Sequence, residues 1–389
     1  MNALTGIRGL AALWVVAYHF SLSPLASLEF QQVFPIAKCG YLGVDLFFLL
    51  SGFILTHVHG TDTATLSLRR VAHFWGLRLA RIYPVHLAML CALVAFVVFG
   101  AAIGVVPHHP EDFRARDFFY SLLLVQAWGV ADDIHWNFPA WSISCEWLVY
   151  LLFPLVALAV ARVRSVAGAA LLLGADAAVF ALVYRIVFRC DLNLRFDEGN
   201  FARFALLRIG FEFVAGALAH KIVALGGLRR WPWTIIVIAG LGACVAASFT
   251  PARDFLIVCE CGLAILAGAF SATLVARLLS LAPLLYLGEI SYSIYMVHIP
   301  IRMTVGRAAS AILMRTHSPV TGWLVAAALF LVTVGAAAAV HALIEVPARG
   351  LLRGLMGERG ARAAAVPGSE RASFSAAKSR DRIEPARWR

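Results

Sequence analysis

Long apolar runs alternate with short polar connections along most of the chain, and many of these runs are as long as a bilayer is thick. About 20 apolar residues cross the hydrocarbon core as an α-helix. On this basis we predict ten spanning helices, at residues 3–22, 40–59, 83–106, 143–161, 166–187, 204–223, 232–249, 254–275, 283–303 and 321–345. The apolar run at 117–130 is too short to span and is expected to lie at the interface or to re-enter. The pattern therefore predicts an all-α polytopic membrane protein.

Composition excludes a large soluble domain. The chain has 389 residues, of which 61% are hydrophobic and only 14% are charged, whereas about a quarter of the residues of soluble domains are charged. The formal net charge is +11. Because the basic residues lie between apolar runs and in the C-terminal tail, we expect them to contact anionic lipid headgroups or a phosphate-rich cytoplasmic ligand, and we expect no nucleic-acid partner.

The same pattern divides the chain into a membrane domain and a tail. Residues 1–348 are predicted to form one membrane domain, and residues 349–389 a basic, disordered cytoplasmic tail. The tail is too short for a second folded domain, so no extracytoplasmic catalytic domain is expected. Loop lysines and arginines show no bias between the two sides, but those of the tail place both termini in the cytoplasm. The N-terminal run lacks a basic leader and is predicted to be a retained first span.

Two of the seven cysteines, Cys39 and Cys190, fall in loops that we place on the same, outer side. Spacing alone establishes no pairing, so a disulfide and two free thiols are both open, and the free thiols are favoured. The sequence contains no Cys-x-x-Cys and no Cys/His spacing typical of a metal site, so no metal is predicted.

The first apolar run contains two ionisable residues, Arg8 and His19, which are costly to bury in a bilayer. Their spacing along a helix brings both side chains to within about 20° of one direction and separates them by about 16.5 Å along the axis. One interpretation is a polar stripe along a cavity. The other is that Arg8 snorkels to headgroups while His19 bonds a backbone carbonyl, and the pair alone does not decide between them.

Arg78 and Arg81, in HFWGLRLARIYPVH, share a helix face at the inner edge of the third predicted span. Two converging guanidinium groups suit a phosphate, because each presents a fork of N–H donors. Ordinary flanking of a span by positive residues is the alternative explanation.

Two further stretches carry polar side chains at the fourth and ninth predicted spans. NFPAWSISCEWLVYLLFP contains Trp141, Ser142 and Glu146, whose carboxylate could hold a histidine or an arginine. The tryptophan could equally belong to an interfacial belt. In LGEISYSIYMVHIP, Tyr295 and His298 share a helix face, and they either line the same cavity or simply pack.

The second predicted span, in GYLGVDLFFLLSGFIL, contains the carboxylate of Asp45. Further along it, Ser51 and Gly52 allow a close approach of another helix. Because no GxSxG is present, Ser51 is not predicted to be an esterase nucleophile.

Together these stretches resemble the acyltransferase family 3 of integral membrane proteins. The resemblance covers roughly residues 3 to 347 and is carried, in order, by GIRGLAALWVVAYHF, GYLGVDLFFLLSGFIL, RLARIYPVH, WSISCEW, LGEISYSIYMVHIP and IEVPAR. Each stretch is weak alone, but all of them in this order on a chain with many spans are specific. The resemblance implies transfer of an acyl group, often acetyl, from cytoplasmic acyl-CoA to a hydroxyl of a carbohydrate or similar acceptor.

The family's functional positions carry over residue by residue. Its motif of an arginine and a histidine with ten residues between them maps onto Arg8 and His19, its paired-arginine motif onto Arg78 and Arg81, and its acidic and histidine positions look similar to Asp45, Glu146 and His298. Some relatives carry an extra extracytoplasmic hydrolase-like domain. No such fusion is expected here, so a second acyl-relay step would need a separate protein.

Each of these residues has an expected role. His19 is the general base on the acceptor hydroxyl, and Glu146 or Asp45 fixes its tautomer. The CoA phosphates are expected to meet Arg8, Arg78 and Arg81, and the acceptor to meet Trp141, Ser142, Tyr295 and His298. Direct transfer and a covalent acyl-enzyme are both open, with direct transfer favoured because no activated serine or cysteine motif is visible.

The alternative function is a carrier for an anionic solute or glycan intermediate, because carriers also have many spans and intramembrane charges. Inverted repeats would favour a carrier, and we see no clear repeat. For the enzyme we expect acyl-CoA, with acetyl-CoA favoured, as donor substrate rather than bound cofactor, and a carbohydrate or glycolipid as acceptor. The expected location is the bacterial inner membrane. The acceptor, the acyl chain length and the oligomeric state stay open.

Overall fold

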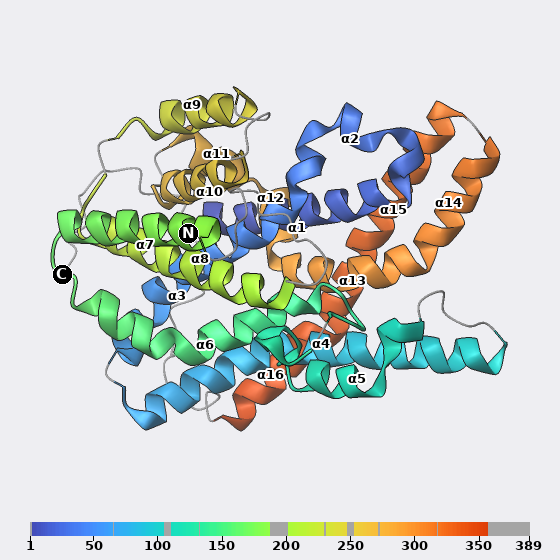
Figure 1. Cartoon of the computed structure of the whole chain (residues 1–389), viewed down its shortest axis with the longest axis horizontal. Helices are drawn as coiled ribbons and strands as arrows, with labels where there is room; N and C mark the ends of the chain where they lie inside the picture. Colours follow the sequence, from blue (N-terminus) through green and yellow to red (C-terminus); the bar gives the residue numbers. More distant parts are fainter. Residues whose placement is uncertain are drawn as a thin grey trace, which may run out of the picture.

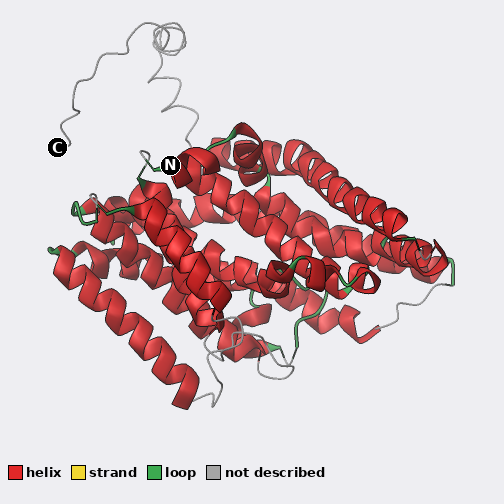
Figure 2. Ribbon diagram, turned by 90° about the horizontal axis from the view of Figure 1, so that it is seen from above, coloured by secondary structure: helices red, strands yellow, loops and turns green. Residues whose placement is uncertain are grey.

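The structure is a computed structural model that describes residues 2–64, 66–104, 110–131, 133–186, 201–228, 231–246, 253–270, 273–316 and 318–356. Helices dominate these residues, and no strand occurs among them (Figure 2). The prediction of an all-α protein is therefore confirmed for the part of the chain that is described. Cys190 lies outside it, so its pairing with Cys39 stays untested.

Figure 1 shows the helices in chain order. The longer ones are α1 (Asn2–Leu22), α3 (Gly43–Thr63), α4 (Leu68–Ala102), α6 (Ala140–Ala161), α7 (Val166–Ile186), α8 (Phe201–Ala224), α9 (Trp233–Ala246), α10 (Arg253–Ala269), α13 (Ser291–Met303), α14 (Val305–Thr316) and α15 (Pro319–Val340). The shorter ones are η1 (Leu25–Leu28), α2 (Phe30–Val33), η2 (Pro35–Leu42), η3 (Pro110–Phe113), α5 (Ala115–Leu122), η4 (Gln126–Val130), α11 (Leu274–Leu279), α12 (Ala282–Glu289), η6 (His341–Glu345) and α16 (Val346–Leu355).

Among the described residues, six helical segments are long and apolar enough to cross a membrane, which makes this a multi-pass membrane protein. They are Asn2–Leu22, Pro35–Thr63, Leu68–Ala102, Ala140–Ala161, Val166–Ile186 and Val320–Leu355. The predicted count of ten is not confirmed. Among the other candidates, α8 carries Arg208, Glu212 and Lys221, and the expected span at 283–303 is interrupted at Ile290 between α12 and α13. Helices α9 and α10 have only 14 and 17 residues.

Helices α3 and α8 pack with their backbones in close contact. A Cβ placed on Gly52 would clash with the Phe213 carbonyl, and one on Gly216 with the Leu49 carbonyl. The close approach predicted from Gly52 is therefore confirmed, and α8 is the helix that approaches. Small residues at such crossings let backbones come together and increase the packing contacts between helices.

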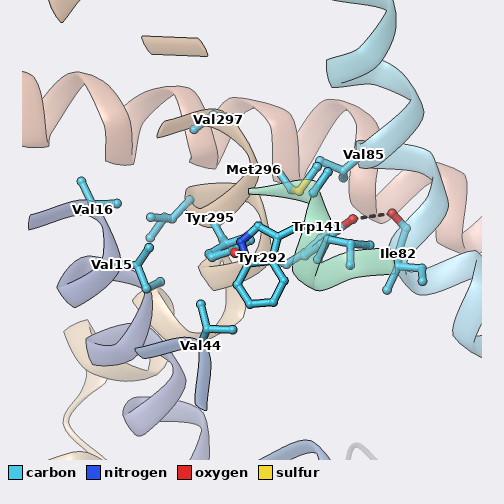
Figure 3. Packing of buried hydrophobic residues seen from close by; sticks show 14 of the residues in the cluster. Val15, Val16, Val44, Ile82, Val85, Trp141, Tyr292, Tyr295, Met296 and Val297 are labelled. Atoms are coloured by element: carbon cyan, nitrogen blue, oxygen red, sulfur yellow. Dashed lines mark hydrogen bonds between the residues drawn. The ribbon is translucent and has the colours of Figure 1, made fainter. Parts of the chain in front are cut away.

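Helix α13 lies at the centre of the largest buried cluster, between α1, α4 and α15. Figure 3 shows Tyr292 and Met296 of this helix among Val15 of α1, Val85 of α4 and Trp141 of α6. The hydroxyl of Tyr292 donates to the Ile82 carbonyl, which ties α13 to α4. This packing holds the polar face of α13 in a fixed position relative to α1 and α4.

The last helical segment runs without interruption from α15 through η6 into α16. The boundary predicted between residues 348 and 349 falls inside α16, which packs against α4. Arg349 and Arg353 therefore belong to the folded domain. The remainder of the expected tail, from residue 357, lies outside the described residues.

Candidate active site

A cavity of about 140 Å³ lies between α1, α3, α4, α6 and α13. Most of its wall is apolar, and α3 contributes the largest apolar part, including Val44, Phe47 and Ile54. Its polar wall contains six residues that the sequence analysis selected, namely Arg8, Arg78, Arg81, Ser142, Glu146 and Tyr295. Residues from four separate helices thus meet in one site, as a polar stripe along a cavity requires.

Positive charge dominates one end of this cavity. Arg8 makes no ion pair or hydrogen bond with any described residue, and the Arg78 guanidinium lies 5.8 Å from the ring centroid of Phe74. The carboxylate of Glu146 accepts a hydrogen bond from Tyr150 rather than from an arginine. Because the guanidinium groups of Arg8 and Arg78 are not neutralised by a carboxylate contact, this end is suited to bind an anion.

Arg81 is held by Glu345, a residue to which the sequence analysis assigned no role. The buried carboxylate of Glu345 accepts from Arg81, and also from Ser293 at 2.8 Å and Arg349 at 2.8 Å, while His341 Nδ1 lies 3.0 Å away. The stretch IEVPAR, which carries both Glu345 and Arg349, was the available signal. Glu345 positions Arg81 at the cavity wall and offsets part of the local positive charge.

A pair of histidines forms the second centre. Nε2 of His298 lies 3.2 Å from Nδ1 of His19, and the two ring centroids are 4.9 Å apart. Nδ1 of His298 contacts the Tyr295 carbonyl at 2.6 Å, and Nδ1 of His19 contacts the Val15 carbonyl at 3.0 Å. His298 is fully buried, whereas His19 is half-buried.

These contacts assign the tautomers of the two rings. A carbonyl oxygen only accepts, so Nδ1 of His298 carries a hydrogen and its Nε2 is an acceptor when the ring is neutral. Nδ1 of His19 likewise donates, shared between the Val15 carbonyl and His298. Nε2 of His19 is therefore left with a lone pair, which is the form that a general base needs.

Tyr295 connects the two centres. It lines the cavity, and its ring centroid lies 5.7 Å from that of His298. Its hydroxyl is 2.8 Å from Ser142 Oγ and donates to the Pro139 carbonyl at 3.1 Å. Since Tyr295 and His298 share one face of α13, that single helix spans from the arginine-lined cavity to the histidine pair.

The structure places two predicted site residues elsewhere. Asp45 is fully buried in an ion pair with Arg208, which also lies 3.3 Å from Glu212. Trp141 packs in the core and is not part of the cavity wall (Figure 3). Neither Asp45 nor Glu146 contacts His19, although one of them was expected to fix its tautomer. The side chain that contacts the His19 ring in this structure is His298.

Arg302 is a second residue to which the sequence analysis assigned no role. It follows His298 by one helical turn and is half-buried. Its charge acts on the rings of both His19 and His298. The spacing of four residues from His298 on the same helix face was the signal for it.

Comparison with known proteins agrees with this architecture. The family model described as "Acyltransferase domain" matches residues 1–342. The chain is similar to "Acyltransferase MdmB" of Streptomyces mycarofaciens, with 30% identity over 384 residues that cover 90% of this chain and 92% of that protein. No solved structure matches.

Two further relatives have names that state a reaction. "O-acetyltransferase OatA" of Staphylococcus aureus is 26% identical over 330 residues, covering 77% of this chain and 50% of that protein. "Peptidoglycan O-acetyltransferase OatA" of Listeria monocytogenes is 28% identical over 164 residues, covering 39% of this chain and 23% of that protein. The chain thus spans at most half the length of these two relatives.

A helical membrane domain with a positively charged cavity and a histidine pair is consistent with a membrane enzyme. The match over residues 1–342 then decides its class: the chain belongs to the acyltransferase family 3. The protein is a multi-pass membrane acyltransferase, and the alternative of a carrier without acyl-transfer chemistry is set aside.

Proposed function

We propose that the protein transfers an acyl group, with acetyl favoured, from acyl-CoA to a hydroxyl of a carbohydrate or glycolipid acceptor. The observation that carries this proposal is the pairing, through α13, of an arginine-lined cavity with a histidine whose Nε2 is free to accept a proton. The names of the two OatA relatives support an oxygen nucleophile and an acetyl group.

The donor occupies the arginine-lined end of the cavity. Arg8, Arg78 and Arg81 meet the phosphates of CoA, for which guanidinium groups are suited because they offer several donors in a plane. The pantetheine arm then runs along α1 toward His19. The axial distance of about 16.5 Å between Arg8 and His19 suits an extended arm of this kind.

His19 is the general base in the transfer step. Its Nε2 takes the proton of the acceptor hydroxyl while the oxygen attacks the thioester carbonyl carbon. The new C–O bond forms, the C–S bond breaks, and the proton passes from His19 to the departing CoA thiolate. His298 keeps the His19 ring oriented through the 3.2 Å contact, and no acyl-enzyme is required.

The arginine end faces the cytoplasm in this proposal, because acyl-CoA is a cytoplasmic metabolite. Both chain termini then lie inside, in the bacterial inner membrane. The acceptor approaches the histidine pair, and Ser142 and Tyr295 at the cavity wall contact it. Labelling of single introduced cysteines from each side of the membrane tests this orientation.

The decisive experiment compares acyl transfer by His19→Ala and by the native enzyme in proteoliposomes supplied with labelled acetyl-CoA. A second experiment identifies the acceptor by comparing surface glycans, by mass spectrometry, in cells with and without the gene. His19→Ala is expected to lower acyl transfer about 10²- to 10⁴-fold with unchanged CoA binding. His57→Ala, which changes an exposed histidine on α3, is the matched control. Wild-type transfer by His19→Ala would overturn the assignment of the base.

A further inference from the structure

The cavity is too small for the whole donor that the proposed function requires. Pockets that enclose a drug-sized ligand have volumes of about 300–1,000 Å³, whereas this cavity has about 140 Å³. It has room for part of the acyl-pantetheine arm, so the pyrophosphate lies at its arginine-lined end and the adenosine with its 3′-phosphate must lie outside. The groups that bind the 3′-phosphate are therefore beyond Arg78 and Arg81, on the neighbouring surface.

Helix α16 presents two more arginines at that place. Arg349 Nη2 donates to Glu345 at 2.8 Å, and Glu345 in turn holds Arg81 of the cavity wall. Arg353 follows Arg349 by one helical turn, so both lie on one face of α16. The charges of Arg78, Arg81 and Arg353 all act on Arg349. A continuous group of guanidinium ions thus extends from the cavity to the surface of α16.

The carboxylate of Glu345 is shared by two arginines, and not every hydrogen bond of this group is made. Arg81 and Arg349 both donate to Glu345, and the charges of Arg78 and Arg353 act on Arg349. The buried Nε donors of Arg78 and Arg349 have no hydrogen-bond partner in the structure. A buried donor without a partner is destabilising, and so are like charges held together, so this arrangement favours a bound anion.

We propose that Arg349 and Arg353 bind the 3′-phosphate of the acyl-CoA donor, an inference that rests on the proposed function. In CoA this phosphate lies on the ribose, farther from the thioester than the pyrophosphate. Arg78 and Arg81 of the cavity wall accordingly bind the pyrophosphate, and the two arginines of α16 bind the terminal phosphate monoester. The helix assigned to a tail by composition is therefore part of the donor site.

The test compares CoA with 3′-dephospho-CoA, which differs only in this phosphate, by calorimetric titration of the protein in phosphatidylcholine vesicles. The native protein is expected to bind CoA about tenfold or more tightly than dephospho-CoA, as hydrogen bonds to a charged group imply. Arg349→Gln and Arg353→Gln are each expected to reduce this ratio toward one. Arg349→Lys keeps the positive charge and should therefore retain part of the native preference for CoA over dephospho-CoA.

Controls separate binding from folding. Unchanged affinity of each variant for dephospho-CoA shows that the rest of the site is intact. Arg162→Gln removes an exposed arginine at the end of α6 and should leave the ratio at its native value. If both α16 variants keep the native ratio, the assignment of the 3′-phosphate is wrong.

A lipid phosphate is the other source of the same chemistry, and repeating the titration with phosphatidylglycerol in the vesicles distinguishes it. If the α16 variants lose a response to phosphatidylglycerol but keep the CoA ratio, these arginines bind lipid and the inference is overturned. If the native protein binds neither CoA nor dephospho-CoA, it is the proposed acyl-CoA donor that fails.

Discussion

Two ionic clusters lie in the same helical bundle and differ in their solvent exposure and in their ratio of acidic to basic groups. Around Asp45, the carboxylate and the guanidinium of Arg208 are 0% and 2% exposed, and Glu212 adds a second acid. Around Glu345, the carboxylate is 1% exposed, but Arg81 and Arg349 are 17% and 24% exposed. The first cluster is sealed with its cation paired, and the second opens on a cavity with an excess of cations.

This difference distinguishes a structural ion pair from a binding site. The Asp45 cluster joins α3 to α8, where the backbones are also in close contact through Gly52 and Gly216. A sealed pair of this kind fixes the relative position of two helices and has no room for a ligand. The Glu345 cluster instead positions Arg81 at the cavity wall, where its guanidinium can also meet an anion.

The largest effect is expected from Asp45→Ala. Removing the closer carboxylate leaves the buried Arg208 with only Glu212 at 3.3 Å, so the free energy of unfolding should fall by about 3 kcal/mol, the lower end of the cost of breaking a buried pair. Thermal unfolding in detergent measures this change. The triple variant Asp45→Leu, Arg208→Met and Glu212→Gln removes all three charges and should recover most of the loss. A fully stable Asp45→Ala protein would contradict a structural role.

For Glu345→Gln we expect a smaller loss of stability together with weaker binding of the acyl-CoA donor. Its arginine partners reach water, so the loss in unfolding free energy should be only about 1–3 kcal/mol. Arg81 loses its anchor, and the KM for acyl-CoA should rise about tenfold. Steady-state kinetics and unfolding are measured on the same preparation. If Glu345→Gln loses as much stability as Asp45→Ala while its KM for acyl-CoA is unchanged, the Glu345 cluster is a structural ion pair like the Asp45 cluster and not a binding site.

A smaller effect is expected for Arg81→Lys. The lysine keeps the charge but not the planar fork of donors that meets a phosphate and Glu345 together. The KM for acyl-CoA should rise roughly fivefold, which corresponds to about 1 kcal/mol. Lys38→Arg, outside the site, serves as the control. A KM equal to that of the native enzyme would show that charge alone suffices at this position.

The smallest effect comes from salt. The Debye length falls from about 30 Å at 0.01 M to about 10 Å at 0.1 M ionic strength, so donor binding at the open cluster should weaken roughly twofold to fivefold over this range. The sealed Asp45 pair is screened much less, and the midpoint of thermal unfolding should stay the same. A fall in both quantities would mean that the two clusters are equally accessible to ions.

The sequence predicted which residues share a helix face better than it predicted which residues form ion pairs. The spacing of Arg8 and His19, and of Arg78 and Arg81, placed each pair on one face, and the structure brings the three arginines to one cavity. The partner of Asp45 is 163 residues away, and that of Arg81 is 264 residues away. Periodicity along one helix contains no information about such pairs, which is why Arg208 and Glu345 were missed.

The predicted count of ten spans is not confirmed for a related reason. The stretch 283–303 is long enough to span, yet its backbone is interrupted at Ile290 between α12 and α13. Where α12 and α13 lie against α1 is decided by tertiary packing rather than by hydropathy. The same packing turns Tyr295 and His298 toward the site, which hydropathy alone does not reveal.

The contact between Arg81 and Glu345 also has a consequence for biosynthesis. The cavity takes Arg8 from α1, whereas the carboxylate that positions Arg81 is supplied by one of the last described helical segments. Translation proceeds from the amino terminus, so a nascent chain already inserted in the membrane has its arginines but not their anchor. The anchor of Arg81 is therefore in place only after residue 345 has been translated and inserted, and chains truncated before it lack this contact.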